Sequence, residues 1–231
     1  MLASKDHPVN VGFLMGGGVA LFIVSLPWAR DLDPSLSWRD LVLWLTFGGI
    51  LVYELFTTTN IPRIAFTILS FLYLPWALGY LLTLRYIPDS TLGLWTLLVP
   101  VVATVGTDVA AYFTGIYLGR HKLVPRLSPG KTVEGSLGGL AGSIAGLFIL
   151  FGFATWLNPE GMPFTAWELI LIGLFLSVVS QIGDLAESML KRYYGIKDSG
   201  SFLPGHGGLL DRIDSLLFSI PTAYFLVRIF T

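Results

Sequence analysis

The sequence predicts an all-α fold, that of a polytopic integral membrane protein with about seven transmembrane helices. Hydrophobic residues make up 54% of the 231 residues, and charged residues only 13%, which is about half the share in an ordinary soluble domain. The mean hydropathy of +0.72 points the same way. The apolar residues are also gathered into runs of about 20, the length that a helix needs to cross a bilayer.

The runs follow one another along the whole chain, and so little sequence is left over that we expect a single membrane domain over residues 1–231. In that domain, residues 1–90 mainly form scaffold helices and residues 104–220 form the catalytic part. The first run follows Lys5 but does not end in a small-residue cleavage site, so we expect a retained helix. The predicted helices are 9–28, 41–56, 64–84, 92–118, 137–157, 166–183 and 213–230.

The first 90 residues contain apolar helices with tryptophans near the expected membrane interfaces. Glu54 is the acidic residue of this part that falls inside a predicted helix. We expect it either to pair internally or to lie near the inner surface of the membrane.

Lysines and arginines set the predicted orientation, because cytoplasmic loops of membrane proteins carry an excess of them. With the N-terminus inside, most of the 14 basic residues fall on the inner side. Nearly half of all charged residues lie in two stretches, 120–134 and 184–214, and both would then face the cytosol. We therefore expect a multi-pass protein of the cell membrane whose active site lies on the cytosolic face. The absence of cysteine excludes disulfides and thiol chemistry.

Glycines recur at intervals of four in the fifth predicted helix, at Gly138, Gly142 and Gly146. Small residues at this spacing let two helices approach closely. Packing within the chain is the favoured interpretation, and a dimer interface is the alternative.

Asp108 falls deep inside the fourth predicted helix, on the same helical face as Thr104 and Tyr112. A carboxylate at such a place is costly unless it has a partner or faces a polar cavity. Two interpretations stay open: a buried hydrogen bond, to Tyr112 for example, or a contact with metal or substrate.

Residues 119–135 combine basic side chains, hydroxyls and glycines ahead of a glycine-rich helix. Free backbone N–H groups at helix starts and glycine turns bind anions, and lysine adds charge. Gly130-Lys131-Thr132 resembles the end of a P-loop, but the earlier glycine and the preceding strand are missing. We therefore predict phosphate binding without a P-loop fold.

A polar stripe marks the inner end of the sixth helix, where Gln181, Asp184, Ser188 and Lys191 share one face. Carboxylates suit Mg²⁺, which takes one or two of them together with waters and substrate phosphates. The following loop, 191–208, is basic and then rich in glycine, and Asp211-Arg212-Ile213-Asp214 comes next. These last two aspartates either cap the final helix or belong to the same site.

The run from Ser188 to Asp214 resembles the signature of phosphatidate cytidylyltransferases, also called CDP-diacylglycerol synthases. The matching positions are Ser188, Leu190, Lys191, Arg192, Lys197, Asp198, Gly200, Leu203, Pro204, His206, Gly207, Gly208, Asp211, Arg212, Ile213 and Asp214. Earlier blocks around Asp108, Gly119-Arg120 and 128–135 are similar to that family as well. Two departures stand out, since Val109 replaces a common Thr or Ser and the amino-terminal region is shorter than in many members.

The resemblance implies transfer of a cytidylyl group from CTP to phosphatidic acid, with release of pyrophosphate, in phospholipid biosynthesis. It implies Mg²⁺ on Asp184 and Asp211, with Asp108 as a further ligand, and leaves a second, monovalent cation open. Asp184, Asp211 and Lys197 are the candidate catalytic residues. The candidate substrate-binding residues are Ser128, Lys131, Thr132, Ser188, Lys191, Arg192, His206, Gly207, Gly208 and Arg212.

The expected partners are CTP, phosphatidic acid and membrane lipid, with no nucleic acid, and the resemblance implies a homodimer. One alternative is a related cytidylyltransferase, or a CTP-dependent kinase, that acts on an archaeal or prenyl acceptor. An ion-coupled transporter is the alternative of another class, with Asp108 and Asp184 along its ion path. It leaves the histidine, glycine and aspartate loop at 206–214 without a role.

Overall fold

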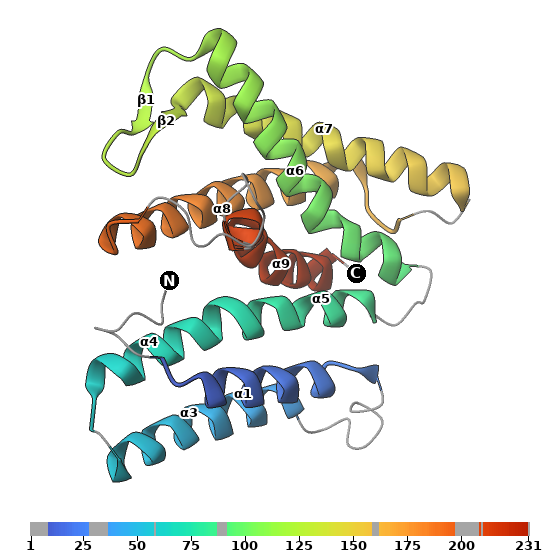
Figure 1. Cartoon of the computed structure of the whole chain (residues 1–231). Helices are drawn as coiled ribbons and strands as arrows, with labels where there is room; N and C mark the ends of the chain where they lie inside the picture. The colour runs from blue at the N-terminus through green and yellow to red at the C-terminus, as the bar shows by residue number, and fades with distance from the viewer. Residues whose placement is uncertain are drawn as a thin grey trace. The chain divides into compact units, whose positions relative to one another are not determined.

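The computed structural model describes residues 9–27, 37–57, 59–86, 92–158, 162–196, 208 and 210–230 (Figure 1). Helices account for nearly all of its regular structure, and the only strands among these residues form one short hairpin. The prediction of an all-α, multi-pass membrane protein is confirmed. The helices form two compact units, Met1–Tyr86 and Ile87–Thr231.

The described residues of the first unit form four helices and a π-helical turn. They are α1 (Val11–Val24), α3 (Trp38–Phe56), α4 (Ile61–Phe71), η1 (Leu72–Trp76) and α5 (Ala77–Arg85). Leu21, Val42 and Phe71 form a buried cluster where α1, α3 and α4 meet. Gly17 permits this approach, because a Cβ there would lie 2.6 Å from the Phe71 ring.

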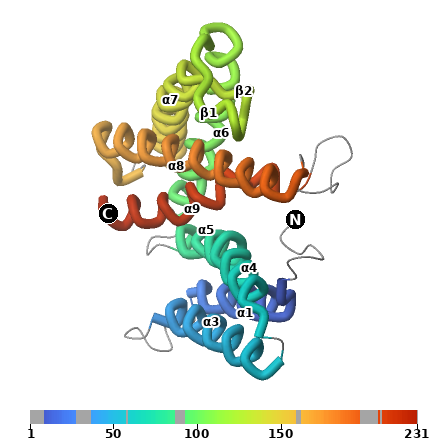
Figure 2. Tube along the Cα trace, turned by 90° about the vertical axis from the view of Figure 1, so that its left-hand side faces the viewer, coloured from blue at the N-terminus to red at the C-terminus, as the bar shows by residue number. Residues whose placement is uncertain are grey.

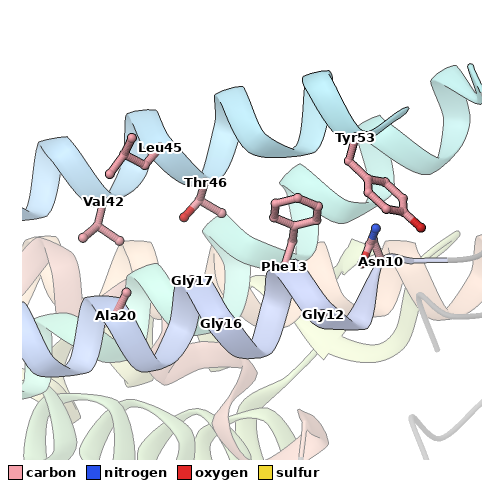
Figure 3. Close-up of a pocket in the computed structure, with 10 residues that line it drawn as sticks. All are labelled: Asn10, Gly12, Phe13, Gly16, Gly17, Ala20, Val42, Leu45, Thr46 and Tyr53. Carbon is pink, nitrogen blue, oxygen red and sulfur yellow. The ribbon is translucent and has the colours of Figure 1, made fainter. Parts of the chain in front are cut away.

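A groove of about 530 Å³ runs between α1 and α3 (Figure 3). Phe13 points from α1 toward α3, and its ring meets that of Tyr53 edge to face at 5.8 Å. The described residues that line the groove carry no charge. It therefore offers apolar surface, without the acids and bases that phosphate chemistry needs.

The π-helical turn is explained by Pro75, which lies inside it. Proline lacks the N–H that an α-helix requires and clashes with the carbonyl one turn earlier. A wider turn relieves this clash, so that α4, η1 and α5 continue as one apolar helix, Ile61–Arg85.

Glu54 pairs with a residue of the same chain, which was one of the two expectations from the sequence. Its buried carboxylate lies 3.1 Å from Nε of Arg63, and only 1% of the side chain is exposed. The partner therefore comes from the next helix, α4, and neutralises a charge that α3 could not bury alone.

The second unit contains the two polar stretches. Its elements are α6 (Leu92–Leu118), β1 (Lys122–Val124), β2 (Ser128–Thr132), α7 (Val133–Leu157), α8 (Ala166–Tyr193) and α9 (Leu210–Phe230). Figures 1 and 2 show α6 crossing α7, with the hairpin at the junction of the two helices, and α8 beside α9. The hairpin was not predicted, because its strands are short and its sequence is polar.

The glycine-rich helix α7 packs against α6 of the same chain, in agreement with the favoured interpretation of packing within the chain. Gly142 of α7 lies directly against Gly106 of α6, where an added Cβ on Gly106 would stand 2.6 Å from the Gly142 carbonyl oxygen. Hydroxyl groups reinforce the bundle, because Thr107 bonds to Ser177 of α8 at 2.9 Å. Close backbones and interhelical hydrogen bonds are the usual means of packing helices in lipid.

Five helices within the described residues are long and apolar enough to cross a membrane, so the count of seven is not confirmed. They are Ile61–Arg85, Gly93–Leu118, Val133–Leu157, Ala166–Tyr193 and Leu210–Phe230. The helix at the first apolar run, α1, has 14 residues, fewer than a bilayer requires. The helix α3 is not among the five candidates, because its 19 residues include the charged Arg39, Asp40 and Glu54.

Candidate functional site

A cavity of about 490 Å³ with charged and polar side chains in its wall lies between the C-terminal half of α6, the hairpin, the start of α7 and the C-terminal half of α8. Its lining brings together residues that are far apart in the sequence. Among them are Asp108, Ser128, Lys131, Thr132, Ser136, Gln181 and Asp184. The upstream polar stretch and the stripe on the sixth predicted helix therefore meet at one place.

The hairpin is held in place by Glu134. Its carboxylate accepts hydrogen bonds from the backbone N–H groups of Arg120 and His121, at 3.0 and 3.1 Å, and contacts His121 Nδ1 at 2.6 Å. The antiparallel pairing of Lys122 with Thr132 then closes the turn. Because both ends are fixed, Ser128 and Lys131 are carried to the cavity wall.

Thr132 is the N-cap of α7, and its hydroxyl oxygen accepts a hydrogen bond from the Gly135 N–H at 3.0 Å. The Val133 N–H is also in use, donating to the His121 carbonyl at 2.9 Å. The expectation of free N–H groups at this helix start is therefore not met at Val133 and Gly135. Side chains, Lys131 above all, are the groups that this segment offers to an anion.

Asp184 of α8 forms an ion pair with Lys131 across the cavity. Asp108 lines the same cavity and interacts electrostatically with both of these residues. This position favours the interpretation that Asp108 contacts metal or substrate. Asp214, at the buried start of α9, interacts with Asp108 and Asp184 as well, although the cavity lining does not include it.

Lys191 lies at the centre of a second charged cluster. Its ammonium group pairs with Glu187 one turn earlier on α8 and with Asp211 of α9 at 3.0 Å. The other oxygen of Asp211 accepts a hydrogen bond from the Gly208 N–H at 2.7 Å. Asp211 therefore links Gly208, the start of α9 and Lys191. It is not one of the described residues that line the cavity of Asp108 and Asp184.

The other predicted site residues are spread around these clusters. Arg192 donates from Nε to the Leu127 carbonyl at 3.4 Å, which ties α8 to the hairpin turn. Ser188 is half-buried on α8, and Arg212 is exposed in the first turn of α9. Lys197, His206 and Gly207 lie outside the described residues, and their predicted roles stay predictions.

The donor set of the cavity fits a hard divalent cation. Asp108 and Asp184 offer carboxylate oxygens, and Mg²⁺ needs only one or two carboxylates when waters and phosphates complete its shell. The described residues do not form a metal site made of protein ligands alone, because no three of their His, Asp or Glu side chains group around a common point. A cation bound together with a polyphosphate agrees with both observations.

Two features of the site escaped the sequence analysis. Glu187 is fully buried beside Lys191, and its spacing of four residues from that lysine was the signal that could have revealed it. Ser136 bonds to Gln181 across α7 and α8, and no sequence spacing predicts a contact between residues 45 positions apart.

Comparison with known proteins supplies the family. The profile of the Cytidylyltransferase family matches residues 2–230. A phosphatidate cytidylyltransferase of Bacillus subtilis (strain 168) is 42% identical over 190 residues, which cover 82% of this chain and 66% of that protein.

Two further relatives carry the same name. The protein of Brucella suis biovar 1 is 44% identical over 142 residues, covering 62% of this chain and 50% of its own length. That of Staphylococcus haemolyticus is 45% identical over 115 residues, covering 50% of this chain and 42% of its own. The chain thus spans about half to two thirds of the length of these relatives, and the predicted resemblance is confirmed. This chain belongs to the Cytidylyltransferase family.

Proposed function

We propose that the protein transfers a cytidylyl group from CTP to phosphatidic acid and releases CDP-diacylglycerol and pyrophosphate. The observation that carries the proposal is the cavity in which Lys131 pairs with Asp184 beside Asp108. Acids and bases gathered at the end of membrane-spanning helices suit a reaction between a polyphosphate and a lipid phosphate. The relatives named above, all phosphatidate cytidylyltransferases, support the same reaction.

The chemistry requires little from a protein nucleophile or base. An oxygen of the lipid phosphate attacks the α-phosphorus of CTP, a new P–O–P linkage forms, and the bond to the β-phosphate breaks. Since this oxygen is already anionic near neutral pH, the main barrier is repulsion between negative charges. Positioning and charge neutralisation can lower that barrier.

Basic side chains of the two clusters would neutralise these charges. Lys131 faces the cavity, and a phosphate that approached it would compete with Asp184 for its ammonium group. Lys191, Arg192 and Arg212 lie at the ends of α8 and α9 and would bind the lipid phosphate or the leaving pyrophosphate. Ser128, Thr132, Ser188 and His206 would add hydrogen bonds. Lys197 would add positive charge, and Gly207 and Gly208 would let the backbone come close to the phosphates.

Asp108 and Asp184 would hold Mg²⁺, and Asp211 stays a candidate ligand. Asp214 joins the candidates because it interacts with the first two carboxylates. When bound, Mg²⁺ would withdraw negative charge from the triphosphate. In the absence of substrate, the ion pair with Lys131 neutralises Asp184.

The proposal places the site on the cytosolic face of the cell membrane. The distribution of Lys and Arg over the loops supports this orientation, as does the need for CTP to arrive from water while the lipid enters from the leaflet. A homodimer is part of the proposal through the family resemblance alone.

The test is an assay of the purified, detergent-solubilised protein with labelled CTP, phosphatidic acid and Mg²⁺. We expect a labelled lipid and pyrophosphate, and loss of both when EDTA is added. A parallel reaction with an archaeal or prenyl phosphate tests which lipid phosphate is the acceptor. Product with that acceptor but none with phosphatidic acid would refute the proposed substrate, and no product with any acceptor would refute the reaction.

A further inference from the structure

Ser136 and Gln181 form a reciprocal hydrogen-bonded pair between α7 and α8. The Ser136 hydroxyl donates to Oε1 of Gln181 at 2.5 Å, and Nε2 of Gln181 donates back to the Ser136 carbonyl at 3.3 Å. The same Nε2 also donates to the Ser177 hydroxyl oxygen at 3.2 Å. Both ends of the amide are therefore engaged, which fixes its orientation.

The pair continues into a chain of neutral side chains that reaches α6. Ser177 accepts a second hydrogen bond from Thr107, at 2.9 Å. Ser136, Gln181, Ser177 and Thr107 thus connect three helices, and none of them carries a charge.

Each end of this chain lies next to a charged residue of the cavity. Thr107 directly precedes Asp108 on α6, and Gln181 lies one turn before Asp184 on the same face of α8. Ser136 lies in the first turn of α7, five residues after Lys131 of β2. Ser136 and Gln181 themselves line the cavity. The neutral network therefore joins α6 and α8, which carry Asp108 and Asp184, to α7, which directly follows the strand of Lys131.

The two sets of contacts differ in what substrate would do to them. The Lys131–Asp184 ion pair must loosen when Lys131 turns to a phosphate, because the ammonium group cannot serve both fully. The Ser136–Gln181 bonds involve no charge, so an arriving anion does not draw them apart. They can therefore keep α7 and α8 in register beside the cavity while the ion pair opens.

We propose that Gln181 is a positioning residue, which acts through Ser136 and Ser177 to hold Lys131, Asp184 and Asp108 at their working separations. This inference rests on the proposed function for its kinetic consequences. Its structural content, a link that fixes the distance between two helices at the cavity, does not depend on that function.

The first experiment compares three purified variants in the cytidylyl transfer assay. Gln181→Leu removes all three hydrogen bonds of the amide, and Ser136→Ala removes the one that the Ser136 hydroxyl donates. Ser143→Ala is the matched control, since Ser143 also lies on α7 and bonds to α8, at the Gly173 carbonyl at 2.8 Å, but is absent from the cavity lining. We expect kcat to fall on the order of 10- to 100-fold in the first two variants and to stay within about twofold in the control.

Ser136→Thr keeps the hydroxyl and should retain most of the kcat that Ser136→Ala loses. The melting temperature of every variant is measured alongside, because a purely structural role would lower Tm and kcat to the same extent in Ser143→Ala. Equal kcat losses in Ser136→Ala and Ser143→Ala, or unchanged kcat in Gln181→Leu, would overturn the proposal.

The second experiment measures the helix separation directly. The chain has no cysteine, so Leu137→Cys and Ile182→Cys give two unique, exposed sites for spin labels beside Ser136 and Gln181. We expect Gln181→Leu to broaden the label-to-label distance distribution and Ser143→Ala to leave it unchanged. Identical distributions in all three backgrounds would overturn the proposal, and this result holds even if the protein proves inactive in the transfer assay.

Discussion

At the scale of single residues, the lysines of the two charged clusters each pair with carboxylates. Lys131 pairs with Asp184, and Lys191 pairs with both Glu187 and Asp211. An unpaired charge at these places would be expensive, because the helices that carry them are otherwise apolar. A phosphate that took one of these lysines would leave its carboxylate in need of another counter-ion.

The sequence alone could predict that Asp184 and Lys191 lie on one face of the same helix, because helical spacing fixes which residues share a face. It could not predict that Lys131 reaches Asp184, since that pair depends on how the hairpin folds over α8. For the same reason it could not separate Asp211, which is tied to Gly208 and Lys191, from Asp214, which interacts with Asp108.

Asp184→Asn should lower the rate of transfer on the order of 10²- to 10³-fold, because the amide neither pairs with Lys131 nor binds a cation as a carboxylate does. The elution volume and Tm should stay close to those of the parent protein. Asp40→Asn, at an exposed position on α3, is the control and should keep the parental rate. Near-normal turnover of the Asp184 variant would contradict its assignment to the site.

Arg63→Ala should destabilise the first unit by about 3 kcal/mol, because it removes the arginine that neutralises the buried Glu54 carboxylate. Thermal unfolding in detergent measures the effect as a lower Tm. Adding Glu54→Gln should recover part of the loss, since the charge is then removed. Arg228→Ala changes an exposed arginine on α9 and should leave Tm unchanged. An equal Tm for the two arginine variants would show that the ion pair contributes nothing.

At the scale of elements, hydropathy located the helices better than their ends. The predicted helix 92–118 agrees with α6, but α8 continues ten residues past the predicted end at 183. Its last turns are polar on the face that lines the site, so the apolar run ended before the helix did. The hairpin was not predicted for a different reason. The hydrogen bonds that hold it join Glu134 to the backbone of Arg120 and His121, and a hydropathy pattern does not predict such contacts.

The interface of α6 and α7 depends on backbone contact at Gly106 and Gly142. Gly106→Val should therefore force the helices apart, at a cost of about 1–3 kcal/mol or more, and lower both Tm and the yield of monodisperse protein. Gly152→Ala is the control on α7, because an added Cβ there meets nothing within 4 Å. Similar Tm values for these two variants would mean that the glycine contact is unimportant.

At the scale of the whole molecule, the polar ends of several spans gather on one side of the second unit. The hairpin follows the C-terminal end of α6, and the Lys191 cluster lies at the C-terminal end of α8 and the start of α9. Composition and hydropathy predicted the multi-pass architecture, because lipid demands apolar helices. They could not predict the number of spans, since length and charge set α1 and α3 apart from the other apolar helices.

The proposed orientation can be tested with single cysteines in the cysteine-free chain. Arg126→Cys, exposed on the hairpin, should react with a membrane-impermeant maleimide only when the cytosolic face is accessible. Asn158→Cys, just after the opposite end of α7, should react from the outside of intact cells. The reverse pattern would show that the site faces the cell exterior.

The central claim is that the cytidylyl group, and no other part of CTP, passes to the lipid. The most direct measurement follows two separately labelled forms of CTP, one with radioactive phosphorus at the α-position and one at the γ-position, in the presence of phosphatidic acid. Cytidylyl transfer predicts that the α-label enters the lipid and the γ-label leaves in pyrophosphate. A γ-label in the lipid would contradict the account and identify a kinase instead.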